Sequence, residues 1–149
     1  MLKVLFLHGL ESLPGGTKPD ALELAGCEVA NPALPKDDFD LSVKIAQECV
    51  EEFQPDVIVG SSRGGAVAMA LCNESARLVL IAPAWKSYGS EPKVTSGTQI
   101  LHCSTDDIVE YKDSVRLAAL NSVKLTTCGV DHRMNDEDAL NSLVRIVNE

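Results

Sequence analysis

The chain has 149 residues, of which 45% are hydrophobic and 23% are charged, a balance that fits one globular domain spanning 1–149 and excludes a large second domain. Its formal net charge of −9 argues against non-specific binding to nucleic acid or to an anionic membrane surface. The five cysteines are scattered without a CxxC pair, which favours reduced thiols and a cytoplasmic location over a disulfide framework.

The first part of the chain alternates between strand and helix patterns. The predicted elements are, in order, a strand at 3–8, a helix at 18–25, a strand at 27–34, a helix ending near 53 and a strand at 56–60. Asp37 and Asp38 both offer an N-cap for the second helix. The apolar run at 3–8 is too short to cross a membrane and has no small-residue cleavage site after it, so we expect neither a membrane span nor a signal segment.

The same alternation continues to the end of the chain. The predicted elements are a helix at 64–73, a strand at 76–84, a strand at 98–104, a helix at 110–120, a strand at 123–128 and a last helix that Asn135 caps. Strands that alternate with helices indicate βαβ units, and therefore a three-layer, doubly wound parallel sheet of about six strands. Functional residues in such folds lie just beyond the carboxyl ends of the strands.

A strand-to-helix turn with a specific glycine spacing follows the third predicted strand. Residues 60–64 read GSSRG, a G-x-S-x-G pattern that puts Ser62, and not Ser61, at the nucleophile position. Small residues on either side allow a turn tight enough to project the serine hydroxyl above the sheet. A glycine-rich turn without chemistry is the plainer interpretation, but the strand before the motif and the helix after it favour a nucleophile.

A serine hydroxyl needs a base to take its proton, and the chain has three histidines. His132 is the candidate base, because it lies in a loop just after the sixth predicted strand. We interpret His102 as a structural strand residue and His8 as part of the loop that it introduces.

The base needs a carboxylate, and the oxyanion needs two hydrogen-bond donors. Asp106 and Asp107 both follow the fifth predicted strand, and their spacing does not choose between them. The backbone N–H groups of Arg63 and Leu10 are the candidate oxyanion donors, because they follow the nucleophile and the first strand respectively.

Four segments together resemble the α/β-hydrolase superfamily: HGLESLPGG, GSSRGG, STDDIV and DHR, in the order serine, aspartate, histidine. The resemblance is strongest to small, lidless bacterial esterases of the YqiA type. It implies Ser62 as nucleophile, His132 as base and Asp106 as acid, although Cys103 stands where glycine is usual. It also implies a minimal form of the fold, with strand order 2-1-3-4-5-6 and no substantial lid between residues 85 and 105.

These features predict a serine hydrolase that cleaves carboxylic esters or thioesters of small acyl groups, with no metal and no other cofactor. Glu11 and Trp85 follow the first and fourth strands and are candidate pocket residues; core packing is the alternative for Trp85. The expected partner is a small-molecule ester, and a monomer and a homodimer both remain open. The rival function is a binding protein on a hydrolase scaffold with little or no turnover. A phosphate site at PGGTK (14–18) is disfavoured, because the segment lacks the G-x-x-x-x-G-K-[ST] spacing.

Overall fold

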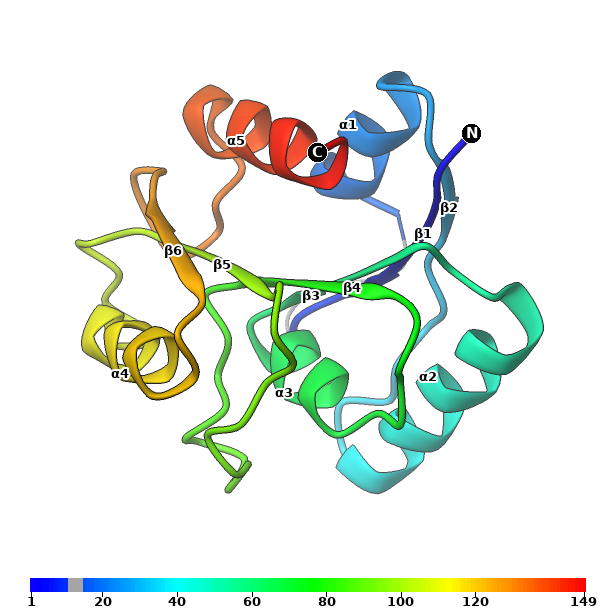
Figure 1. The fold of residues 1–149 in the computed structure, drawn as a ribbon, viewed down its shortest axis with the longest axis horizontal. Coiled ribbons are helices and arrows are strands. Elements are labelled where there is room, and N and C mark those ends of the chain that lie inside the picture. Colours follow the sequence, from blue (N-terminus) through cyan, green and yellow to red (C-terminus); the bar gives the residue numbers. More distant parts are fainter. Residues whose placement is uncertain (11–14) are drawn as a thin grey trace.

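The computed structural model describes residues 1–10 and 15–149, within which strands and helices alternate along the chain (Figure 1). The strands are β1 (Lys3–Leu7), β2 (Glu28–Ala30), β3 (Val57–Ser61), β4 (Arg77–Ile81), β5 (Gln99–His102) and β6 (Lys124–Thr127). The helices are α1 (Thr17–Leu24), α2 (Phe39–Phe53), α3 (Arg63–Met69), α4 (Tyr111–Asn121) and α5 (Glu137–Val147).

All six strands are parallel and form one sheet in the order β2-β1-β3-β4-β5-β6, which confirms the predicted order. Helices α1 and α5 cover one face of the sheet, and α2, α3 and α4 cover the other (Figure 1). The central strand β3 is buried along its whole length. Its Val57 and Val59 pack into one apolar cluster, and Ile58 between them packs into the other, so the sheet separates two cores.

Several predicted strands extend too far at their carboxyl ends. Strand β4 ends at Ile81, because Ala82 has a positive φ of 42° and is followed by Pro83, which together turn the chain out of the sheet. Strand β2 has only three residues and ends before Pro32.

The N-caps of α2 and α5 test two predictions from the sequence. Asp38 caps α2 and accepts a hydrogen bond from the Leu41 N–H at 2.9 Å, as one of the two predicted aspartates. The prediction that Asn135 caps the last helix is wrong. Asp136 is the N-cap of α5 and accepts from the Ala139 N–H, whereas Asn135 accepts a hydrogen bond from the Lys18 ammonium at 3.0 Å.

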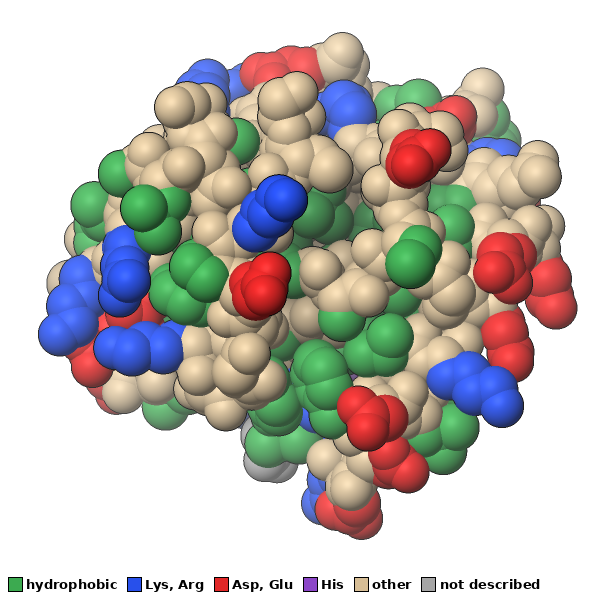
Figure 2. Space-filling model, turned by 60° about the horizontal axis from the view of Figure 1, so that its bottom comes forward, with side chains coloured by type: hydrophobic (Ala, Val, Ile, Leu, Met, Phe, Trp, Pro, Cys, Tyr) green, Lys and Arg blue, Asp and Glu red, His purple; other side chains and the backbone are tan. Residues whose placement is uncertain are grey.

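The segment between β4 and β5, residues 82–98, contains no helix or strand, which confirms the expectation of a lidless fold. Figure 2 shows the molecule from the side of α2, α3 and α4, with acidic side chains gathered toward α2. Within residues 1–10 and 15–149, no helix combines the length and apolar character needed to cross a membrane.

Candidate active site

Ser62 lies in a sharp turn between β3 and α3. Its backbone has φ 55° and ψ −116°, a conformation that a non-glycine residue rarely adopts. Hydrogen bonds from both sides hold this turn: the Ser62 N–H donates to the Ile81 carbonyl at 2.8 Å, and the Ser62 carbonyl accepts from the Ala84 N–H at 3.0 Å. The strained serine is therefore fastened to β4 and to the loop that follows it.

Glycines around Ser62 are required by close backbone contacts. A Cβ at Gly60 would lie 2.5 Å from the Gly64 carbonyl oxygen, and a Cβ at Gly64 would overlap the Leu7 carbonyl oxygen. A Cβ at Gly65 would come within 2.8 Å of Pro83. The glycines of the motif thus let α3 begin directly against β1 and β3, which is the physical reason for the spacing seen in the sequence.

The structure brings Ser62, His132 and Asp106 together from three loops. His132 Nε2 lies 3.0 Å from Ser62 Oγ, and His132 Nδ1 lies 2.6 Å from Asp106 Oδ2. Because a carboxylate oxygen only accepts, Nδ1 carries the imidazole proton and donates it to Asp106. Nε2 is then free to accept the Ser62 hydroxyl proton, which is the arrangement that a general base needs.

Asp106 is held by four hydrogen-bond donors. The Ile108 and Val109 N–H groups donate to Oδ1 at 2.8 and 2.9 Å, and two histidines meet Oδ2. Burial of this side chain opposes its ionisation, but the hydrogen bonds from His132 and the two backbone groups outweigh burial and hold the pKa of Asp106 below its ordinary value. The carboxylate is therefore charged at neutral pH.

The second histidine on Asp106 is His102, at the end of β5, where the sequence predicts a structural strand residue. It is fully buried, and its Nε2 lies 3.0 Å from Asp106 Oδ2. The spacing of four residues between His102 and Asp106 was the available signal. A buried histidine near the acid is not distinguishable from a core residue by its apolar strand context alone.

The two candidate oxyanion donors lie at the same edge of the sheet. The Arg63 N–H begins α3, and among the described residues neither this group nor the Leu10 N–H has a hydrogen-bond partner. A Cβ at Gly9 would lie 3.5 Å from Ser62 Cβ, so the start of the loop after β1 passes beside the serine. The roles of the Arg63 and Leu10 N–H groups as oxyanion donors stay predictions.

The Arg63 side chain is turned into the protein and is only 2% exposed. Its Nη2 donates to the Pro35 carbonyl at 2.9 Å and to Ser42 Oγ at 3.1 Å, and its guanidinium lies over the rings of Phe39 and Tyr88. Arg63 thus connects the loop before α2 with the loop after β4, and its charge is directed away from bulk solvent.

The two candidate pocket residues have different outcomes. Trp85 is 4% exposed, packs into the apolar cluster under α2, α3 and α4, and donates its Nε1–H to the Asp113 carbonyl at 3.2 Å. This placement corresponds to the core-packing alternative, and does not put the ring at an open pocket. Glu11 lies outside the described residues.

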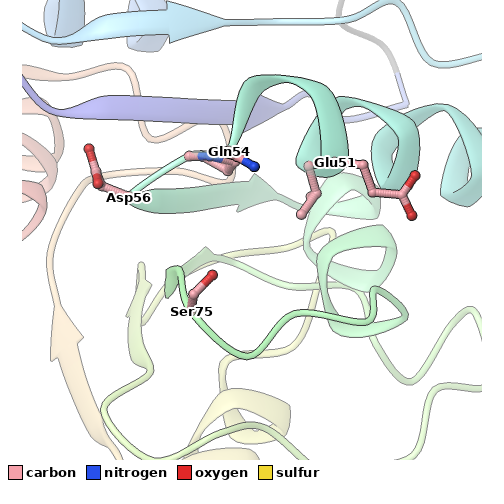
Figure 3. Close-up of a pocket in the computed structure, with 6 residues that line it drawn as sticks. Glu51, Gln54, Asp56 and Ser75 are labelled. Carbon is pink, nitrogen blue, oxygen red and sulfur yellow. The ribbon is translucent and has the colours of Figure 1, made fainter.

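A pocket of about 520 Å³ lies at the other end of the sheet (Figure 3). It is lined by Val50, Glu51, Gln54, Pro55, Asp56 and Ser75. Asp56 immediately precedes β3, whereas Ser62 follows it, so this pocket is separated from the serine by the length of the strand. It has no part in the arrangement around Ser62.

Comparison with protein-family models and with curated proteins gives no match. Solved structures do match over nearly the whole chain. Mouse α/β-hydrolase domain-containing protein 10 is 16% identical with a TM-score of 0.81, and the match covers 98% of this chain and 88% of that one.

Two bacterial structures match similarly. A Xanthomonas campestris protein, described as a hydrolase of the alpha/beta superfamily, is 19% identical with a TM-score of 0.75, covering 97% of this chain and 94% of that one. An esterase from Exiguobacterium antarcticum is 13% identical with a TM-score of 0.73, covering 100% and 92%. At these identities the likeness shows the fold, which is that of the α/β-hydrolases.

Proposed function

We propose that this chain is a serine hydrolase that cleaves carboxylic esters or thioesters of small acyl groups. The observation that carries the proposal is the continuous chain of hydrogen bonds from Ser62 Oγ through His132 to Asp106, with 3.0 and 2.6 Å between the successive atoms. A serine, an imidazole in the correct tautomer and a buried carboxylate are the parts that nucleophilic acyl transfer requires.

In the first step Ser62 Oγ attacks the carbonyl carbon while its proton passes to His132 Nε2. The Arg63 and Leu10 N–H groups donate to the oxyanion of the tetrahedral intermediate. When the intermediate collapses, the bond to the leaving oxygen or sulfur breaks, and His132 Nε2–H protonates the leaving group. Asp106 stays ionised and stabilises the imidazolium while it exists.

In the second step water attacks the acyl-enzyme. His132 Nε2 takes a proton from the water, and collapse of the second tetrahedral intermediate releases the carboxylic acid and returns the proton to Ser62 Oγ. Neither step requires an oxidant, a reductant or a metal. The segment between β4 and β5 forms no helix or strand, which supports the proposal that the site is open to small esters.

A reducing compartment suits this chain, because all five cysteines are free thiols: Cys27, Cys49, Cys72, Cys103 and Cys128. We therefore extend the proposal to a cytoplasmic enzyme.

The test is hydrolysis of p-nitrophenyl acetate by the wild type, Ser62→Ala and Ser61→Ala. Ser62→Ala is expected to lower kcat/KM by about 10,000-fold or more, because it removes the nucleophile. Its Tm should stay within about 2 °C of wild type, because no packing is lost.

Ser61→Ala is the matched control, because Ser61 is the adjacent serine and ends β3 without a side-chain hydrogen bond among the described residues. It should keep most of the activity. Full activity in Ser62→Ala, or equal losses in both variants, would remove Ser62 from the nucleophile position.

A further inference from the structure

Asp106 is shared by two histidines rather than one. His132 Nδ1 and His102 Nε2 both meet the same oxygen, Oδ2, at 2.6 and 3.0 Å. The mechanism above uses only His132. His102 is fully buried at the carboxyl end of β5. A buried polar side chain that contacts the proposed catalytic carboxylate needs an explanation.

The surroundings of His102 fix its protonation. Nε2 also lies 3.0 Å from the Val109 carbonyl oxygen, so both its neighbours are acceptors and Nε2 carries the proton. Nδ1 lies 2.6 Å from Ser114 Oγ in α4 and accepts a hydrogen bond from that hydroxyl when the ring is neutral. Burial lowers the pKa of His102 in spite of the attraction of Asp106, so the ring is neutral at pH 7.

The groups that face His102 come from three elements. Asp106 lies in the loop after β5, His132 lies in the loop after β6, and the Tyr111 ring of α4 meets the imidazole edge-on at 5.6 Å. Ser114 adds a second contact from α4. His102 therefore ties the carboxylate of the proposed site to a helix that carries none of the reacting groups.

We propose that His102 is a positioning residue for the reaction proposed above: its Nε2–H holds Asp106 Oδ2 in the direction of His132 and shares that oxygen with it. The proposal rests on the proposed function of Ser62, His132 and Asp106. The backbone donors of Ile108 and Val109 fix Oδ1 alone. With His102 present, both oxygens have a donor besides His132, so the carboxylate cannot turn when the proton moves.

The donation from His102 to Oδ2 also weakens the hydrogen bond that His132 Nδ1–H makes to the same oxygen. A neutral donor on Oδ2 withdraws part of the negative charge that His132 Nδ1–H would otherwise meet. Removing it should strengthen the bond from His132 to Asp106 and loosen the orientation of the carboxylate. A residue that only filled the core would affect stability without changing this bond.

The experiment compares His102→Gln with His102→Asn in the full chain. The amide nitrogen of Gln reaches the position of Nε2 and keeps the donor, whereas Asn is one methylene shorter and does not reach. The first readout is the low-field proton resonance of His132 Nδ1–H without substrate, assigned with His132→Ala. The second is kcat, KM and the pH profile of p-nitrophenyl acetate hydrolysis.

The Asn variant is expected to shift the His132 resonance downfield, to change the pH profile and to lower kcat by about 10- to 100-fold, with KM within about twofold. The Gln variant should restore the wild-type resonance and keep kcat within about threefold of wild type. If the Asn variant does not fold, Ser114→Ala replaces it, and it should shift the same resonance because His102 loses its fixed partner on α4.

The proposal is overturned if the shortened variant leaves the resonance and the pH profile as in wild type, or if Gln and Asn behave alike in both readouts. The resonance needs no turnover. An inactive wild type would therefore contradict the proposed hydrolase function, while the comparison of Gln with Asn would still decide whether His102 holds Asp106.

Discussion

Asp106 and Asp107 are neighbours in the sequence but differ in almost every physical respect. The Asp106 side chain is fully buried and accepts from His132 Nδ1 at 2.6 Å. Asp107 is exposed and has no side-chain hydrogen bond or ion pair with the described residues. One of these adjacent carboxylates is thus buried and the other is exposed to solvent. Only the buried one, Asp106, contacts the imidazole of His132.

This difference predicts unequal effects of removing each charge. Asp106→Asn should lower kcat of ester hydrolysis by roughly 1,000- to 10,000-fold, because an amide in place of the carboxylate no longer stabilises the His132 imidazolium or its tautomer. Asp107→Asn is the matched control and should stay within about twofold of wild type. Steady-state kinetics on both purified variants, with circular dichroism to verify folding, makes the comparison.

Equal activity in the two variants, or a larger loss in Asp107→Asn, would contradict the assignment of the acid. A loss in Asp106→Asn that accompanies unfolding would not count, and for this reason the folded fraction is measured on the same samples.

At the scale of elements, the sequence was most informative where a physical constraint has few solutions. The apolar runs that became β1, β3 and β4 are buried strands, and the glycines at 60 and 64 mark the turn, because only glycine avoids the contacts with Leu7 and α3. The alternation of these elements was enough to predict the parallel sheet, whereas the strand order was implied by the resemblance to the α/β-hydrolases.

The sequence was less informative where adjacent residues compete for one role. Asn135 and Asp136 are both good cap residues, and the structure uses Asp136, whose Oδ1 also accepts from the Val130 N–H at 3.2 Å and so braces the loop that carries His132. Trp85 could not be placed because its partner, the Asp113 carbonyl, belongs to a helix far along the chain. The same holds for His102 and Ser114: contacts between elements decide these roles.

At the scale of the whole molecule, the sheet brings together residues that are far apart in the chain, since Ser62 and His132 are separated by 70 positions. The buried network beneath them should affect the response of the fold to pH. His102 and Asp106 both have pKa values lowered in the folded protein, from ordinary values of 6.5 and 3.8. For His102 the largest cause is burial, and for Asp106 hydrogen bonds outweigh burial.

Both lowered pKa values make the folded protein less stable as the pH falls. The unfolded chain binds a proton on His102 near pH 6.5 and the folded protein does so only at lower pH, so acidification favours unfolding. We expect the free energy of unfolding to be nearly constant from pH 8 to 7 and to decline as the pH falls below 6.5. It should decline further below about pH 4, where the unfolded chain binds a proton on Asp106 and the folded protein does so only at lower pH. Urea unfolding at a series of pH values measures this.

His102→Gln is the control for the decline in stability between pH 7 and pH 5, because Gln does not titrate. The variant should lose less stability than wild type between pH 7 and pH 5. An identical decline in both proteins would show that His102 is not the group responsible.

Covalent capture by a fluorophosphonate tests directly whether Ser62 is an activated nucleophile. The purified chain is incubated with the probe, the adduct is detected by intact mass, and the modified residue is located by peptide mapping. We predict one adduct per chain, on Ser62, with none in Ser62→Ala and a greatly slowed reaction in His132→Ala. No adduct on the folded wild type, or an adduct that persists in Ser62→Ala, would contradict the claim and favour a binding protein on a hydrolase scaffold.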